Sequence, residues 1–266
     1  MERGWPNGHV EPRAWVIHDQ RKDIRMTDTA AAPAATTIVF LLFPGITQLD
    51  FTAPAQALCR MPGARLVGAA ASRDPIATDS GFSILPTDDF ASCPPGDILC
   101  VPGGHGVAEA LGDAATIDFI ARQAAGAKWV TSVCTGAFLL GRAGLLTGKR
   151  ATTHWAYAHL LPLVGAEPVK ARIVEDGNLV TSGGVTSGLD FALTLIGRLH
   201  GDAVAQAIQL AIEYDPAPPY IGGHPDRTPP AITAGLKARV YDAAAERTER
   251  ALIGPLGSSR SRSDGR

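Results

Sequence analysis

Short apolar runs rich in β-branched residues alternate along the chain with stretches in which apolar residues recur at helical spacing. Such runs, continuous rather than alternating with polar residues, are typical of parallel strands buried on both faces. They predict strands at 37–43, 65–71, 97–101, 129–133 and 178–182. The helical patterns cover 55–61, 107–125, 135–146, 189–196, 203–213 and 231–252. This alternation predicts an α/β fold with a doubly wound, mostly parallel, flavodoxin-like sheet.

One pair of strands breaks the parallel pattern. Residues 171–175 and 178–182 flank Asp176-Gly177, a dipeptide that favours a two-residue hairpin turn. We therefore expect one antiparallel hairpin in the sheet.

The ends of the chain differ from its middle in composition. Residues 1–35 mix charges, prolines and an alanine-rich run, and we expect them to form a disordered extension. Met26 precedes Thr-Asp-Thr and the first strand, so we expect translation to start there. Residues 36–252 are predicted to form a single α/β domain, and residues 253–266 a flexible tail.

Composition and charge narrow the range of partners. The 266 residues are 45% hydrophobic, enough for a substantial core, and carry a formal net charge of −2. No basic face for nucleic acid, no apolar stretch long enough to span a membrane and no export signal are expected. The expected partner is a small molecule or a second copy of the chain.

The cysteines favour a reducing cytoplasm and argue against a metal site. Cys59, Cys93, Cys100 and Cys134 lack CxxC spacing and are too few for a disulfide scaffold. The loop at 102–106 lacks the Lys-Ser/Thr of a phosphate-binding loop and the acidic residue of a dinucleotide site. No cofactor is expected, which leaves covalent catalysis by the protein itself.

Cys134 lies where the predicted strand 129–133 turns directly into a helix. A side chain at such a nucleophile elbow stands off the carboxyl edge of the sheet, and the helix N–H groups favour a thiolate. We interpret Cys134 as a nucleophile. The alternative is an inert, buried core thiol, as we expect the other three cysteines to be.

Other strand ends bring candidate partners to the same edge. Asp50 follows the first strand, where ligands bind in open α/β sheets, although an aspartate near a helix N-cap is the more ordinary explanation. Glycine-rich loops follow two further strands, and their backbone N–H groups are expected to bind substrate or a developing negative charge. These loop residues are Gly103, Gly104, Gly183, Gly184 and Val185.

Four segments carry a family resemblance. The run Ser-Val-Cys134-Thr-Gly-Ala-Phe-Leu-Leu, continuing to His154-Trp, resembles the ThiJ/PfpI superfamily, whose members share a class I glutamine-amidotransferase-like fold. The segments 43–54, 93–104 and 213–220 are most similar to the isonitrile (isocyanide) hydratases of that superfamily. The resemblance extends from about residue 38 to 220.

The resemblance implies hydration of isonitriles to N-substituted formamides through a covalent cysteine thioimidate, by a homodimer without cofactor. It implies Cys134 as nucleophile, Asp50 as acid/base and Thr135 as a support beside the thiolate. Ala53 departs from the family, which usually has glycine there. Thr135 stands where the protease-like branch has histidine, which disfavours a Cys-His dyad. His154 is a weaker candidate base, since capping and packing explain it.

Two alternatives stay open. A non-catalytic ligand sensor of the AraC-regulator type shares the Cys-Thr-Gly motif, but about 40 residues after Tyr220 are too few for its DNA-binding domain. Glyoxalase-like or amidase-like chemistry would use the same fold and thiol.

Overall fold

A computed structural model describes residues 35–256, and a seven-stranded sheet lies at its centre. The sheet order is β10 (Ile173–Asp176), β11 (Leu179–Ser182), β7 (Trp129–Val133), β6 (Ile98–Val101), β1 (Thr36–Leu41), β2 (Ala64–Ala70) and β5 (Asp88–Asp89). Within this sheet, β10 and β11 pair antiparallel and the other neighbouring strands pair parallel. The predicted doubly wound, mostly parallel sheet with one hairpin is confirmed. The two turn residues are Gly177 and Asn178, one position later than predicted, because Asp176 pairs with Leu179.

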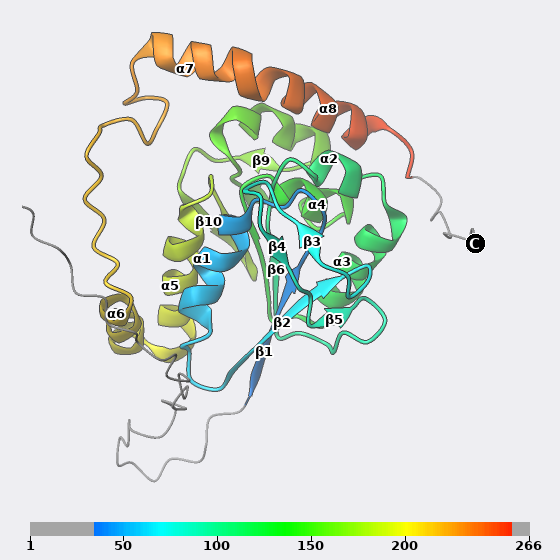
Figure 1. Ribbon diagram of the computed structural model, residues 1–266, viewed down its shortest axis with the longest axis vertical. Coiled ribbons are helices and arrows are strands. Elements are labelled where there is room, and N and C mark those ends of the chain that lie inside the picture. The colour runs from blue at the N-terminus through cyan, green and yellow to red at the C-terminus, as the bar shows by residue number, and fades with distance from the viewer. Residues whose placement is uncertain (1–34, 257–266) are drawn as a thin grey trace, which may run out of the picture. The chain divides into compact units, whose positions relative to one another are not determined.

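Helices cover both faces of the sheet (Figure 1). One face is covered by α1 (Gln48–Leu58), α5 (Ser187–His200) and α6 (Asp202–Ala211). The opposite face carries α2 (Val107–Ala110), α3 (Ala114–Gly126), α4 (Gly136–Arg142), the 3₁₀ helix η2 (Trp155–Val164) and α8 (Asp242–Ile253).

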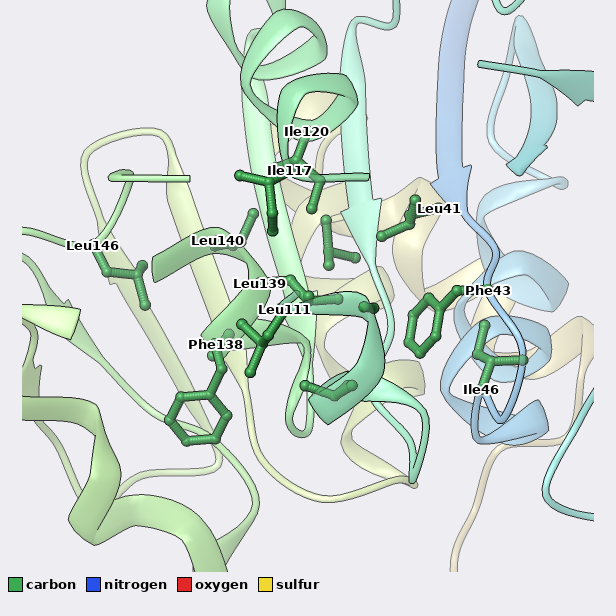
Figure 2. Packing of buried hydrophobic residues seen from close by; sticks show 14 of the residues in the cluster. Leu41, Phe43, Ile46, Leu111, Ile117, Ile120, Phe138, Leu139, Leu140 and Leu146 are labelled. Atoms are coloured by element: carbon green, nitrogen blue, oxygen red, sulfur yellow. The ribbon is translucent and has the colours of Figure 1, made fainter. Parts of the chain in front are cut away.

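The central strands supply both cores because successive side chains point to opposite faces. In β1, Ile38 and Phe40 pack with α1 and α5, whereas Val39 and Leu41 pack with α3 and α4. Figure 2 shows part of the core on the face that carries α3 and α4, where side chains of these helices meet those at the end of β1. Burying one such side chain stabilises the folded state by about 1.5–3 kcal/mol. The two cores therefore hold the strand ends firmly in place.

Short elements complete the structure. β3 (Ile76–Ala77) and β4 (Ser83–Ile84) pair antiparallel, and β8 (Arg150–Ala151) and β9 (Glu167–Pro168) pair parallel. Near the C-terminus, α7 (Pro230–Leu236) continues through a π-helical turn, η3 (Lys237–Tyr241), into α8, and Figure 1 shows these as one long helix. The helical pattern predicted at 231–252 corresponds to this helix.

Three predicted helices have wrong boundaries. α1 begins at Gln48 rather than 55, with Pro54 inside it, so Asp50 lies in a helix and not in a loop. The helix predicted at 107–125 is two helices, because the Asp113 carboxylate accepts from the Thr116 N–H (3.1 Å) and starts α3 afresh. The helix predicted at 135–146 ends at Arg142, near Gly144 with φ +79°.

The disordered extension predicted for residues 1–35, with its start at Met26, lies outside the described residues apart from residue 35. The predicted tail at 253–266 is described only to residue 256, with Ile253 ending α8. Between residues 35 and 256, none of the helices combines the length and the apolar character needed to cross a membrane.

Candidate active site

Cys134 occupies a strained corner between β7 and α4. Its φ of +56° is in the left-handed region, which costs a non-glycine residue about 1–2 kcal/mol. Hydrogen bonds hold the corner: the Cys134 N–H donates to the carbonyl oxygens of Ser182 (3.1 Å) and Gly183 (2.9 Å), and the Thr153 hydroxyl donates to the Cys134 carbonyl (2.7 Å). The side chain is 6% exposed. The predicted strand, corner and helix are therefore present, with the thiol fixed at the sheet edge.

Gly136 allows the corner to pack this tightly. A Cβ atom at this position would lie 2.1 Å from the Val101 carbonyl oxygen and 2.6 Å from that of Pro102. Only glycine fits between the start of α4 and the end of β6.

Asp50 lies in the first turn of α1 and is fully buried, with 0% exposure. Its Oδ2 accepts from the Gly103 N–H at 3.0 Å, while Oδ1 has no hydrogen-bond partner among the described residues. The carboxylate does not cap its helix, since Thr47 occupies the N-cap position. The ordinary N-cap explanation thus does not account for Asp50.

The pKa of Asp50 is raised by burial to about 7. The Gly103 N–H and the nearby Cys134 thiol favour the carboxylate and limit the rise, while the charge of Asp79 adds to it. A carboxyl group that titrates near neutrality beside a thiol can accept and return a proton.

The pKa of Cys134 is also raised, by burial first and by the charge of Asp50 second. The Thr135 and Val185 N–H groups and the Thr135 hydroxyl favour the thiolate, but do not outweigh burial. The predicted preference of the helix N–H groups for a thiolate is present, but burial and the Asp50 charge outweigh it. Burial and the charge of Asp50 thus favour the thiol form of Cys134.

Gly103 and Gly104 hold side chains rather than present free donors. The Gly103 N–H donates to Asp50, and the Gly104 N–H donates to Thr135 Oγ1 at 3.0 Å. Because both N–H groups already donate to side chains of the protein, the geometry does not favour their expected role in binding a developing negative charge. They position Asp50 and Thr135 against Cys134.

Replacing Gly103 with alanine is expected to lower activity by at least about tenfold, with a smaller effect on folding. The new Cβ would lie 2.6 Å from both the Thr135 N and its Oγ1 and 3.0 Å from Asp50 Oδ2, so the groups around the thiol must shift. Steady-state kinetics and thermal unfolding of the variant check this. The matched control is Gly126→Ala, since Gly126 has open space around its Cα. Equal kinetics for the two variants would contradict the positioning role.

The second glycine loop lies on the other side of Cys134. The Gly183 N–H donates to the Arg172 carbonyl at 2.9 Å, and a Cβ on Gly184 would lie 2.6 Å from His154 Cδ2. Within this loop the Val185 N–H faces the Cys134 sulfur. Val185 and Thr135 thus supply two backbone donors around the reacting atom.

His154 acts as a cap and packing residue in this structure. Its Nδ1 accepts from the Ala156 N–H at 3.3 Å at the start of η2, and burial lowers its pKa to about 4. With this lowered pKa the imidazole is a poor proton acceptor near pH 7, and the cap and packing predicted for His154 are present. His105, in the loop after β6, is exposed.

Three residues that interact with Cys134 were not predicted from the sequence. Thr153 holds the Cys134 carbonyl, and the phenols of Tyr157 and Tyr241 have raised pKa values through burial and through the charge of a Cys134 thiolate. Tyr241 comes from η3, more than a hundred positions away in the chain. No local pattern indicates such a contact.

A cleft of about 720 Å³ opens beside the corner. Thr153, His154 and the loop 183–186 line it on the side of Cys134, and residues 168–172 and 223–227 line the remainder. The volume suits a small organic ligand. Within residues 35–256, His, Cys, Asp and Glu side chains form no group of three that would hold a metal ion.

The chain matches known proteins in sequence and in fold. The DJ-1/PfpI family profile matches residues 36–198. The chain is 50% identical over 215 residues to the isonitrile hydratase of Pseudomonas putida, covering 81% of this chain and 94% of that protein. It is 33% identical over 139 residues to the HTH-type transcriptional regulator GbdR of Pseudomonas aeruginosa, covering 51% of this chain and 37% of the regulator.

Among solved structures, a ThiJ/PfpI family protein from Pseudomonas syringae superposes with a TM-score of 0.81. It is 34% identical, and the match covers 92% of this chain and 98% of that one. The fold, the strand-to-helix corner at Cys134 and the sequence match over residues 36–198 lead to one assignment. The chain belongs to the DJ-1/PfpI family.

Proposed function

We propose that the protein is an isonitrile hydratase that converts isonitriles to N-substituted formamides through a covalent intermediate on Cys134. The observation that carries the proposal is the buried pair of the Asp50 carboxyl, with a pKa of about 7, and the Cys134 thiol. The 50% identity to the isonitrile hydratase of Pseudomonas putida supports the substrate class.

The first step forms a carbon–sulfur and a carbon–hydrogen bond. In the reactive state Asp50 is ionised and Cys134 is a thiol, so the pair carries one proton. Asp50 takes this proton, the sulfur adds to the terminal carbon of the isonitrile, and Asp50 delivers the proton to the same carbon. The product is a thioimidate, R–N=CH–S, on Cys134, with Asp50 again ionised.

The second step adds water and releases the sulfur. Asp50 accepts a proton from water as the oxygen adds to the thioimidate carbon, and that proton passes to the nitrogen. The tetrahedral intermediate then loses sulfur as its hydroxyl proton returns to the pair, giving R–NH–CHO. One proton of the formamide comes from the pair and one from water, so the atoms balance.

Burial holds the pKa of Asp50 near the working pH, where one group can act as both base and acid. We assign to Thr135 and Val185 the stabilisation of the sulfur as it gains or releases charge, since their N–H groups face it.

The pH profile of the wild-type protein tests this proton assignment. Measured as formamide produced from aromatic and cyclohexyl isonitriles, kcat/KM is expected to rise with pH up to about 7, because Asp50 must lose its proton before it can accept that of Cys134. It falls again on the alkaline side, where the thiol ionises and the pair holds no proton, and burial shifts this fall to higher pH by raising the pKa of Cys134. Failure of the wild type to form formamide at any pH would refute the proposed function, and an activity independent of pH between 5 and 8 would refute the role of Asp50.

A ligand sensor is the second candidate, because the chain also matches part of a transcriptional regulator. The residues after α6 favour the enzyme: α8 packs onto the sheet-covering helices of the same domain instead of forming a separate DNA-binding unit. Saturable isonitrile binding without formamide would favour a sensor. Activity on glyoxal-type or amide substrates alone would favour another cysteine-dependent reaction.

We also infer a cytoplasmic homodimer, which the superfamily resemblance implies. Tyr220 and Ile221 are 82% and 81% exposed, and such adjacent apolar side chains suit an interface between two copies. Sedimentation velocity at micromolar concentration would reveal a monomer if the inference is wrong.

A further inference from the structure

The short hairpin of β3 and β4 lies against the segment that leads into α1. The Gly45 N–H donates to the Ala77 carbonyl at 2.9 Å, and the Asp79 N–H donates to the Ile46 carbonyl at 3.1 Å. The backbone of this β3–β4 hairpin is therefore bonded to the residues immediately before the helix that carries Asp50.

The side chain of Asp79 makes a third bond, which reaches the helix itself. Asp79 Oδ1 accepts from the N–H of Gln48, the first residue of α1, at 3.1 Å. The first N–H groups of a helix have no partner within the helix, and a nearby carboxylate can accept from them and complement the helix dipole. Thr47, at the N-cap position, makes no such side-chain bond. Asp79 therefore caps α1 from the β3–β4 hairpin.

The turn that carries Asp79 is closed by its own hydrogen bonds. The N–H and the hydroxyl of Thr78 both donate to the Phe82 carbonyl, at 2.9 Å and 2.7 Å. Gly81 has a φ of +82°, in the left-handed region that suits glycine in a tight turn. The closed turn holds the exposed Asp79 side chain next to the start of α1.

The start of α1 is also fixed from the side of the active site. The Thr47 N–H donates to the Gly103 carbonyl at 3.0 Å, and the Gly103 N–H donates to Asp50 Oδ2 at 3.0 Å. The segment before α1 thus lies between the β3–β4 hairpin and the loop after β6. Gln48 and Asp50 belong to the same first turn, so the residue that caps this turn also supports the acid/base.

The charge of Asp79 also acts on Asp50. Apart from burial, the groups that act on the Asp50 carboxyl are the Gly103 N–H, the Cys134 thiol and the Asp79 charge. The first two lower the pKa of Asp50, whereas the Asp79 charge raises it, because a like charge disfavours ionisation. Removing the Asp79 charge should therefore lower the pKa of Asp50.

We propose that Asp79 is a positioning residue for isonitrile hydration, whose carboxylate caps α1 and so holds Asp50 in place against Cys134. The inference rests on the proposed function and adds to it a residue outside the buried pair. Asp79 is not among the residues that line the cleft, so its effect on the reaction passes through Asp50. A small displacement of an acid/base lowers the rate of proton transfer more than it weakens substrate binding.

Two substitutions separate the hydrogen bond of Asp79 from its charge. Asp79→Ala removes both, and kcat for cyclohexyl isonitrile at pH 8 is expected to fall by roughly 3- to 10-fold with little change in KM. Asp79→Asn keeps an oxygen that accepts from the Gln48 N–H, so its kcat is expected to stay within about twofold of wild type. Formamide release measures both values, and thermal unfolding shows that the variants are folded.

The pH profile of kcat/KM gives the readout that a purely structural cap would not change. Both variants lack the negative charge, so the rise of kcat/KM on the acid side is expected to move to lower pH. At 1 M salt, where the screening length is about 3 Å, wild type and Asp79→Asn should have the same profile. The matched control is Asp74→Ala, at an exposed carboxylate before the same hairpin that accepts from Ser72 Oγ, with unchanged kcat and pH profile.

Several outcomes would overturn the positioning role. These are a wild-type kcat in Asp79→Ala, an Asp79→Asn variant as slow as Asp79→Ala, and an acid side that stays in place in both variants. Should the alanine variant not fold, the acid side of the Asp79→Asn profile decides alone. Absence of formamide from the wild type would instead overturn the proposed hydratase function, before any variant is considered.

Discussion

Replacing Asp50 with asparagine is expected to lower kcat/KM for an isonitrile by about 10²- to 10⁴-fold, the usual worth of a positioned acid or base. Asparagine has nearly the shape of aspartate and can still accept from the Gly103 N–H, but it cannot take the Cys134 proton. The rise of activity up to pH 7 is expected to disappear with the carboxyl group. Steady-state kinetics from pH 5 to 9 measure both effects.

The same substitution is expected to stabilise the protein at high pH. The folded pKa of Asp50, about 7, lies above its ordinary value of 3.8, so the folded state binds the proton more tightly and loses stability as the pH rises from 3.8 through 7. At 1.36 kcal/mol per pKa unit this penalty is about 4 kcal/mol at pH 8, and the new buried amide offsets about 1–2 kcal/mol of the gain. Denaturant unfolding should therefore give Asp50→Asn an advantage of roughly 2–3 kcal/mol at pH 8, which shrinks as the pH falls and becomes a deficit of about 1 kcal/mol near pH 4, where the cost of the buried amide remains.

Asp118→Asn is the matched control, because Asp118 is an exposed aspartate on α3. It should change neither the kinetics nor the unfolding free energy by more than about 0.5 kcal/mol. An Asp50→Asn variant that is less stable than wild type at pH 8, or that retains full activity, would contradict a buried acid/base with a raised pKa.

The sheet, and the position of the site residues at one edge of it, could be predicted because both follow from local patterns of apolar residues. Continuous apolar runs specify parallel strands buried on both faces, and parallel strands end at one edge of the sheet. Since β1, β6, β7 and β11 are neighbours in the sheet, the segments that follow them and carry Asp50, Gly103 and Cys134 meet at that edge.

The pKa of Cys134 and the hydrogen bonds of the glycine loop could not be predicted in the same way. The helix start favours a Cys134 thiolate, as local reasoning indicated, but burial and the Asp50 charge are set by segments distant in the chain and shift the pKa upward. The use of the Gly103 and Gly104 N–H groups by Asp50 and Thr135 likewise depends on how two loops pack. Pro54 led to a helix start that was too late, because a proline in an otherwise helical stretch usually marks a boundary.

The position of Tyr241 next to residues far away in the chain could not be predicted from the sequence either. It lies in a largely polar helical pattern, and only the π-helical turn and the packing of α8 bring its ring to His154. A sequence pattern with a period of 3.6 carries no sign of a single wider turn.

Cys134→Ala is expected to remove the covalent route entirely, because the sulfur forms the bond to carbon in the first step. Loss of a nucleophile that acts together with its base costs at least about 10³-fold in kcat. Alanine meets the same backbone strain at φ +56° that cysteine does, so the corner is expected to keep its shape. Cys59→Ala, at an exposed thiol after α1, is the matched control.

The role of Cys134 is tested most directly by the formamide released from aromatic and cyclohexyl isonitriles by wild type, Cys134→Ala and Cys59→Ala under identical conditions. We expect formamide from wild type and Cys59→Ala at similar rates, and at least about 10³-fold less from Cys134→Ala. Undiminished formamide from Cys134→Ala, or none from the wild type, would contradict covalent hydration on Cys134.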